Sequence, residues 1–326
     1  VSNVCIPLSI GLIGSYLKKK MPEIDVTILK KSNEIISFID SNKFDVIGIC
    51  SYLWNANLGN RLARYAREKN PKTYIVFGGP EITKAPIDEK SFFKKYAFAD
   101  MLVDREGELA FVNLLKIYLE EKRDPKKTRS RINELGNCFF IDHENSQFVS
   151  GPAFSRIQHL EDVPSPYLTG LFDHFLKDDF YQPLLQTNRG CPYKCTYCIE
   201  GQDYFNRINF FSVDYVKKDL DYIAERVNPS VGVFIVDSNW GMYKQDVEIA
   251  LHMRELQDQY NWPMQVVAST GKSQLPRIKR VAEILQNAMK MTNAMQSRNN
   301  DVLDAIKRKN ASNLDEFMKG SDNISR

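Results

Sequence analysis

The 326-residue sequence predicts an α/β protein in two parts, a doubly wound parallel sheet followed by a partial (β/α) barrel. Short apolar segments alternate with amphipathic segments over residues 1–125, as in sheets whose parallel strands are joined by helices. The same strand-then-helix order resumes over residues 183–326. Residues 126–182 carry a predicted β-hairpin, within 137–149, and then a connection rich in proline and aromatic residues. We therefore expect two domains joined by this region.

The predicted elements of the first part follow one another with short connections. The strands are predicted at Asp25–Leu29, Asp45–Ser51, Tyr74–Phe77 and Asp100–Val103, and the helices at Pro7–Met21, Asn33–Ile39, Leu58–Glu68 and Glu106–Glu121. This order is typical of a flavodoxin-like fold, whose ligands bind beyond the carboxyl ends of the strands. Such a fold needs a strand before the first helix, but only six residues precede Pro7. We therefore expect the first strand to be missing and the natural chain to begin upstream of Val1.

The second part is predicted to contain four strand-and-helix units. After the apolar pair Leu184-Leu185, strands are expected at Val231–Val236, Gln265–Ala268 and Lys290–Ala294, and helices at Val213–Arg226, Lys244–Tyr260, Pro276–Asn287 and Asp301–Lys309. The polar tail from Asn310 to Arg326 contains nothing apolar enough for another strand.

Composition limits the class of protein. The chain is 43% hydrophobic and 26% charged, with a formal net charge of +3, no long apolar span and no signal-peptide pattern. We therefore expect a cytoplasmic, globular protein without a membrane partner. The near-neutral charge argues against nucleic acid as the main partner. The basic clusters Lys18–Lys20 and Lys30–Lys31 lie where predicted elements end, so they are expected to be solvated.

Three closely spaced cysteines are the strongest chemical signal. Cys191, Cys195 and Cys198 follow Arg189-Gly190 on a loop predicted beyond the end of an apolar strand. Three thiolates can hold a 4Fe-4S cluster that normally takes four cysteines, which leaves one iron without a protein ligand. A zinc site is the main alternative, but zinc needs four ligands and the four histidines show no matching spacing. A disulfide is less favoured, because nothing else indicates a secreted chain.

With Tyr197 before the last cysteine, this motif resembles that of the radical S-adenosylmethionine (SAM) enzymes. The resemblance implies that SAM binds the open iron through its amino and carboxylate groups. It also implies that an electron from the cluster cleaves SAM to a 5'-deoxyadenosyl radical, with Tyr197 beside the adenine. Because the cores of these enzymes usually have six strand-and-helix units, we expect the barrel to be truncated at its C-terminus.

The same resemblance selects polar residues after the predicted barrel strands. Asp237, Ser238 and Asn239 occupy the place where the family presents polar groups to the amino end of SAM. Gln296 matches the place of contacts to the ribose hydroxyls. A polar turn at the end of a strand is the plainer interpretation of the first three. No residue is assigned a catalytic role from the sequence.

Two loops of the first part match cobalamin-binding domains. Ser51 and Leu53 fit their Ser-x-Leu element, and Gly78-Gly79 fits the glycine pair that follows one strand later. Glycines allow close approach of a ligand to the backbone, and a serine hydroxyl can donate a hydrogen bond. A tight turn is the plainer interpretation of the glycines. The family's Asp-x-His-x-x-Gly motif is absent from Val4–Gly11, which predicts cobalt without a histidine ligand.

Taken together, the motifs resemble the cobalamin-binding-domain-containing radical SAM proteins. This implies an enzyme that abstracts hydrogen from a small-molecule substrate and transfers a methyl group from methylcobalamin to an unactivated carbon, with flavodoxin or ferredoxin as reductant. One alternative is a cobalamin-associated radical rearrangement or cyclisation. Another is a non-catalytic module that binds cobalamin or a metal cluster. The substrate, the product and the oligomeric state do not follow from the sequence.

Overall fold

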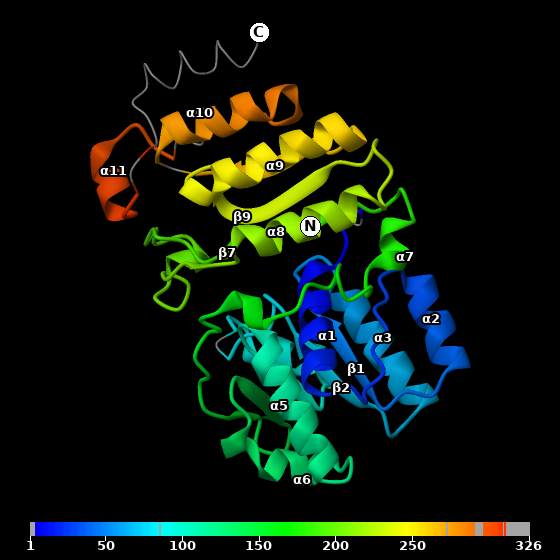
Figure 1. The fold of residues 1–326 in the computed structure, drawn as a ribbon. Coiled ribbons are helices and arrows are strands. Elements are labelled where there is room, and N and C mark those ends of the chain that lie inside the picture. The colour runs from blue at the N-terminus through cyan, green and yellow to red at the C-terminus, as the bar shows by residue number, and fades with distance from the viewer. Residues whose placement is uncertain (1–3, 85, 272, 291–295, 309, 311–326) are drawn as a thin grey trace. The chain divides into compact units, whose positions relative to one another are not determined.

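The computed structural model describes residues 4–84, 86–271, 273–290, 296–308 and 310. They divide into two compact units, which are treated separately below (Figure 1). The N-terminal unit spans residues 9–157, and the C-terminal unit contains residues 4–8 and the residues from 158 onward.

The N-terminal unit is built on a five-stranded sheet. Its strands lie in the order β1 (Val46–Cys50), β2 (Tyr74–Gly78), β3 (Met101–Val103), β4 (Cys138–Asp142) and β5 (Gln147–Ser150). The first three are parallel, as predicted, and β4 and β5 add the predicted hairpin antiparallel at one edge.

Helices bury both faces of this sheet. They are α1 (Leu8–Lys20), α2 (Ser32–Ser41), α3 (Ala56–Lys69), α4 (Glu89–Lys95), α5 (Gly107–Glu120) and α6 (Pro125–Ser130). Because side chains alternate along a strand, Val76 and Phe77 belong to different cores. One core contains Leu114 of α5, and the other contains Ala63 of α3 and Phe92 of α4. The doubly wound arrangement is confirmed.

The predicted strand at Asp25–Leu29 is wrong, because this segment forms no ladder in the structure. In the flavodoxin-like order, the first strand lies between the second strand and the third. The described residues contain no strand in that position, so the segment has no neighbour with which to pair. Only Ile28 of this segment is buried.

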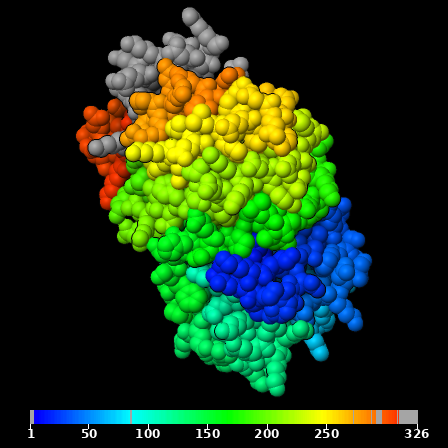
Figure 2. Space-filling model, viewed as in Figure 1, coloured from blue at the N-terminus to red at the C-terminus, as the bar shows by residue number. Residues whose placement is uncertain are grey.

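The C-terminal unit contains a parallel three-stranded sheet in the order β10 (Val266–Thr270), β9 (Val233–Trp240) and β6 (Leu184–Leu185). Its helices are α7 (Asp173–Leu176), α8 (Val213–Ala224), α9 (Lys244–Tyr260), α10 (Leu275–Ile284) and α11 (Asn300–Ala305). Helix α9 packs against α8 and α10, and Figure 2 shows the outer faces of α9 (yellow) and α10 (orange) at the surface. The pairs β6 and α8, β9 and α9, and β10 and α10 correspond to three of the four predicted strand-and-helix units.

The fourth predicted barrel strand, Lys290–Ala294, lies outside the described residues except for Lys290. The preceding residue, Met289, forms a parallel bridge with Val266 of β10. The tail after Asn310 also lies outside the described residues. Within the part of the chain that the structure describes, four short 3-10 helices complete the elements, at Ile132–Glu134, Leu160–Asp162, Ile199–Gly201 and Gln286–Ala288.

A small antiparallel pair, β7 (Asn188–Arg189) and β8 (Asn209–Phe210), joins the two ends of the segment that carries the three cysteines. This segment, residues 190–208, is called the cysteine loop below. It begins shortly after β6 ends, as the sequence predicts. Among the described residues, no helix combines the length and apolar character needed to cross a membrane.

Candidate functional site

The cysteine loop is folded tightly back on itself at its start. Gly190 has a φ of 109°, and a Cβ at this position would lie 2.3 Å from the backbone oxygen of Arg207. The backbone N–H of Cys191 donates to the oxygen of Phe205 at 3.0 Å, and the side-chain amide of Asn206 donates to the oxygen of Cys191 at 3.1 Å. The glycine before the first cysteine is therefore required by the loop's own backbone.

A second turn positions the other two cysteines. The N–H of Cys198 donates to the oxygen of Cys195 at 3.1 Å, and the N–H of Gly201 donates to the oxygen of Cys198 at 3.0 Å. A Cβ on Gly201 would lie 2.2 Å from the oxygen of Cys195, so this turn also requires glycine. Cys191 and Cys195 are buried, Cys198 is half-buried, and all three thiols are free.

The three free thiols supply the ligand type that a cubane iron-sulfur cluster takes. Cysteines that hold a cubane cluster each bind a different iron, so they do not need to meet at one point. The ligand chemistry of the loop therefore fits an iron-sulfur cluster.

Asp237 accepts hydrogen bonds from the residues that lead into the cysteine loop. Alternation along β9 places Asp237 and Asn239 on one face of the strand and Ser238 on the other. The carboxylate accepts from the N–H of Thr187 at 2.9 Å, from the Thr187 hydroxyl, and from the side-chain amide of Asn188 at 3.0 Å. Burial raises the pKa of Asp237 to about 6, and these hydrogen bonds oppose the rise. Both oxygens of the carboxylate therefore serve the chain leading into the cysteine loop.

Asn239 reaches a cysteine directly. Its amide Nδ2 donates to the Sγ of Cys191 at 3.3 Å, and the residue is only 1% exposed. The Oδ1 of the same amide has no hydrogen-bond partner among the described residues. An unpaired buried oxygen costs about 1–3 kcal/mol. A ligand that donates a hydrogen bond here, such as an ammonium group, would remove that cost.

The other residues predicted to contact SAM are more open. Tyr197 is 53% exposed, and its hydroxyl accepts from Nη1 of Arg308 at 3.1 Å. Ser238 is half-buried on the opposite face of β9 from Asn239. Gln296 is exposed, and its backbone N–H donates to Oδ1 of Asn310 at 3.4 Å. Tyr197 also makes a side-chain hydrogen bond with Cys195, so the structure brings both Tyr197 and Asn239 to a cysteine.

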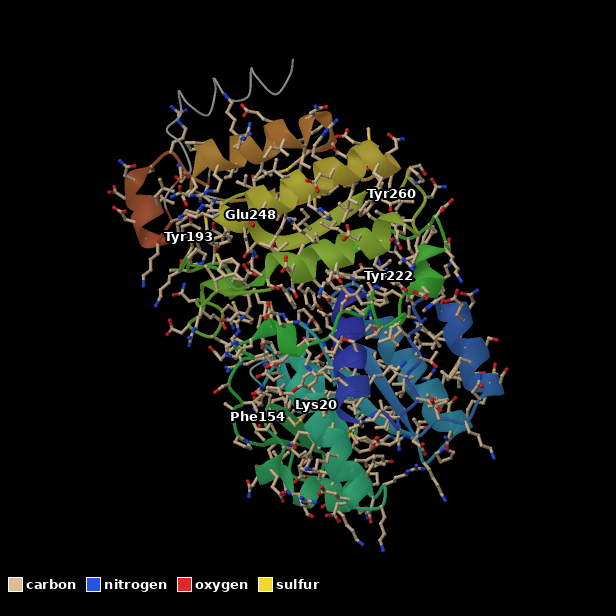
Figure 3. The ribbon with its side chains drawn as sticks, in the orientation of Figure 1. Lys20, Phe154, Tyr193, Tyr222, Glu248 and Tyr260 are labelled. Carbon is tan, nitrogen blue, oxygen red and sulfur yellow. The ribbon has the colours of Figure 1, made fainter. Side chains whose placement is uncertain are left out.

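Tyr193, labelled in Figure 3, ties the cysteine loop to the ends of the neighbouring strands. Its hydroxyl donates to Oγ of Ser273 at 2.8 Å, and the Ser273 hydroxyl donates to the sulfur of Met242 at 3.2 Å. Sequence reasoning did not assign roles to Tyr193 or Asn206. Their partners lie 80 and 15 residues away, so no local motif indicates them.

In the N-terminal unit, the predicted cobalamin residues lie at the ends of β1 and β2. Ser51 is buried, and its Oγ lies 2.9 Å from the hydroxyl of Tyr96. Gly79 has a φ of 101°, and a Cβ there would lie 2.7 Å from the oxygen of Ser51. A Cβ on Gly78 would meet only Val103, at an ordinary 3.7 Å. The chain's own packing therefore requires glycine at position 79 but not at position 78.

Exposed apolar side chains adjoin these residues. Leu53 is 79% exposed, and Trp54 is 61% exposed and stacks on Tyr52 with ring centroids 4.7 Å apart. Apolar and aromatic surface beside a few polar groups is typical of sites for organic cofactors. These strand ends therefore combine exposed apolar surface with the buried hydroxyl of Ser51.

Comparison with known proteins finds similarity to a cobalamin-binding domain and to radical SAM methyltransferases. Residues 1–115 match the family model of the B12 binding domain. The chain is 31% identical over 284 residues to the cobalamin-dependent radical SAM methyltransferase TokK from Streptomyces tokunonensis, with 84% of the chain and 39% of that protein covered. It is 30% identical over 274 residues to a 2-(S-pantetheinyl)-carbapenam-3-carboxylate methyltransferase from Streptantibioticus cattleyicolor, with 82% of the chain and 38% of that protein covered.

Over more than four fifths of its length the chain is thus similar to cobalamin-dependent radical SAM methyltransferases, and its first 115 residues match the B12 binding domain. Its fold agrees with a solved structure of the cobalamin-dependent SAM radical enzyme OxsB, at a TM-score of 0.61 and 18% identity. That match covers 93% of the chain and 43% of the OxsB chain. The chain spans about two fifths of the length of its curated relatives.

Proposed function

We propose that this chain carries the cofactor-binding part of a radical SAM enzyme that transfers a methyl group, with cobalamin, to an unactivated carbon of a small-molecule substrate. The observation that carries the proposal is the pinned loop of three free cysteines, with the buried amide of Asn239 on Cys191. The methyltransferase relatives support the transfer of a methyl group.

The thiolates of Cys191, Cys195 and Cys198 would hold a 4Fe-4S cluster. When bound, the cluster supplies the electron that cleaves SAM to a 5'-deoxyadenosyl radical, and cobalamin supplies the methyl group. The free Oδ1 of Asn239 would accept a hydrogen bond from the amino group of SAM. Flavodoxin or ferredoxin would serve as the reductant.

The chain's own residues would orient these groups. The buried carboxylate of Asp237 fixes Thr187 and Asn188, and thereby the position from which the cysteine loop starts. In the N-terminal unit, Ser51 and the glycine pair would contact cobalamin. The stretch Val4–Gly11 contains no histidine, so the cobalt would have no histidine ligand from this motif position.

The test is SAM cleavage by the anaerobically reconstituted chain. We expect bound iron and reductant-dependent 5'-deoxyadenosine from the unaltered protein, and neither from Cys191→Ala, Cys195→Ala or Cys198→Ala. The matched control is Cys138→Ala, which removes a buried thiol from the core of the other unit and should leave both signals intact.

Two results would contradict the proposal. SAM cleavage that survives in a Cys198→Ala variant would refute the cluster assignment. Iron and corrin bound by the unaltered chain without any 5'-deoxyadenosine would instead indicate a non-catalytic cofactor-binding module.

A further inference from the structure

We infer that Asn239 sets the reduction potential of the cluster, by donating its side-chain N–H to the sulfur of Cys191. This inference rests on the proposed function, because it requires a cluster on the three cysteines. It concerns a property of that cluster, the ease of its one-electron reduction, which neither the motif nor the relatives assign to a residue. Asn239 would act as a positioning and tuning residue through Cys191.

The hydrogen bond is held in place by the strand that carries it. Asn239 is in β9, two residues after the anchored Asp237 and on the same face. The backbone oxygen of the next residue, Trp240, accepts from the N–H of Gly271 on the neighbouring segment at 3.0 Å. The side chain is 1% exposed, so water does not compete for the sulfur. The donor is therefore fixed before any cluster binds.

The amide can face the sulfur in only one useful orientation. An amide offers two N–H donors on nitrogen and only acceptor positions on oxygen. Turning the group over would place Oδ1 against an electron-rich thiolate and leave the nitrogen without its sulfur acceptor. The observed contact, Nδ2 to Sγ at 3.3 Å, is the favourable orientation.

The effect on potential follows from charge. Reduction adds one electron to the cluster, and part of the added negative charge resides on the cysteine sulfurs. A buried N–H donor stabilises the more negative state more than the less negative state, because little solvent screens it. Hydrogen bonds to the sulfurs are one of the factors that set the potentials of such clusters. Asn239 should therefore make the cluster easier to reduce by a one-electron donor of the ferredoxin class.

A redox titration followed by electron paramagnetic resonance, on the reconstituted chain without SAM, tests this. In Asn239→Leu, which keeps similar bulk but no donor, we expect roughly tenfold fewer reduced clusters per oxidised cluster at a fixed potential, equivalent to about 59 mV for one electron. Asn239→Asp, which keeps the shape but presents carboxylate oxygen, should lower the potential further.

Asn206→Leu is the matched control. Asn206 also binds the start of the loop, but it donates to the backbone oxygens of Cys191 and Tyr193, at 3.1 and 3.3 Å, and to no sulfur. Clusters retained in this variant should keep the potential of the unaltered protein. Equal shifts in Asn206→Leu and Asn239→Leu would mean that loop distortion is the cause, and would overturn the inference.

The unaltered protein provides a second test, should the leucine variant fail to hold a cluster. With 15N-labelled asparagine, pulsed resonance of the reduced cluster should show coupling to a side-chain nitrogen, and the absence of this coupling would overturn the inference. The two proposals fail separately. An unchanged potential in Asn239→Leu, together with SAM cleavage by the unaltered protein, refutes only the tuning role. A shifted potential in Asn239→Leu, with no SAM cleavage by the unaltered protein, refutes only the proposed function.

Discussion

The two candidate cofactor regions differ in what their buried polar groups contact. Around the cysteine loop, buried polar side chains form hydrogen bonds with the loop and with Thr187, which precedes it, and the amide of Asn239 donates to a cysteine sulfur. At the ends of β1 and β2, the buried hydroxyl of Ser51 is paired with Tyr96, and the nearby Leu53 and Trp54 are open to solvent. The first region is a preformed polar network, and the second is an apolar surface.

This difference indicates two kinds of preorganisation. A charged cluster in a dry site needs its donors fixed before it binds, because every misplaced polar atom is costly there. A large flat ligand can instead gain binding free energy from apolar area, with few polar contacts. Substitutions around the cysteines should therefore have large effects on stability, whereas substitutions at the β1 and β2 ends should have smaller, graded effects on stability and cobalamin retention.

The largest expected effect comes from removing the anchor of the polar network. Asp237→Leu leaves the buried donors of Thr187 and Asn188 without their acceptor. We expect the free energy of unfolding to fall by roughly 3 kcal/mol, since each orphaned buried donor costs about 1–3 kcal/mol. Urea unfolding followed by circular dichroism measures this. Asp203→Ala, which removes an exposed ion pair to Lys194 on the same loop, should leave the midpoint unchanged. Equal midpoints in both variants would show that the network does not support the fold.

A pH titration tests whether a buried carboxyl lowers the stability of the C-terminal unit at neutral pH. Asp219 in α8 is buried against Ser165, Tyr167 and Tyr215, and burial raises its pKa to about 7. The unfolded pKa is about 3.9. Between these values the folded chain keeps a proton that the unfolded chain has released, so this group's contribution to stability falls as pH rises from about 4 to about 7.

Asp219→Asn should therefore be more stable than the unaltered protein at pH 8, by about 2–4 kcal/mol, and its advantage should shrink toward pH 4. Urea unfolding at several pH values checks this. A constant difference across the whole range would mean that Asp219 does not titrate between the two values.

The two glycines at the end of β2 should respond differently to substitution by alanine. Gly79→Ala introduces a Cβ 2.7 Å from the oxygen of Ser51 at a φ of 101°, and should destabilise the unit by about 1–3 kcal/mol. Gly78→Ala has room and should not affect stability. If cobalamin approaches this backbone, Gly78→Ala should still weaken cobalamin retention in gel filtration. Unchanged retention would remove Gly78 from the site.

The smallest expected effect concerns the hydroxyl pair. Tyr96→Phe removes the partner of Ser51 while keeping the ring that packs on Phe77 and Phe92. The loss of one buried hydrogen bond should cost about 1 kcal/mol. We also expect weaker cobalamin retention, because Ser51 loses its fixed orientation. A variant that is less stable but retains cobalamin fully would assign the pair a structural role alone.

Much of the fold could be predicted because its signals are local. The apolar run at Tyr74–Phe77 and the helical pattern at Lys244–Tyr260 needed no knowledge of distant partners, and the structure contains both elements. The strand predicted at Asp25–Leu29 failed because a strand also needs a neighbour, and the described residues contain no strand in the position beside it.

The candidate site was predicted less completely for the same reason. The spacing of the cysteines is visible in the sequence, but the donors that hold them are not. Asn239 is 48 residues from Cys191, and Tyr193 is 80 residues from Ser273. The sequence also could not distinguish Asp237, whose oxygens serve Thr187 and Asn188, from Asn239, whose oxygen has no partner among the described residues.

The central claim is that the cysteine loop holds a 4Fe-4S cluster with one iron open to SAM. Electron paramagnetic resonance of the reduced, reconstituted protein, recorded with and without SAM, tests it most directly. The account predicts a reduced-cluster signal that changes when SAM is added and is absent from Cys191→Ala. A cluster signal that SAM leaves unchanged, or one that persists in Cys191→Ala, would contradict it.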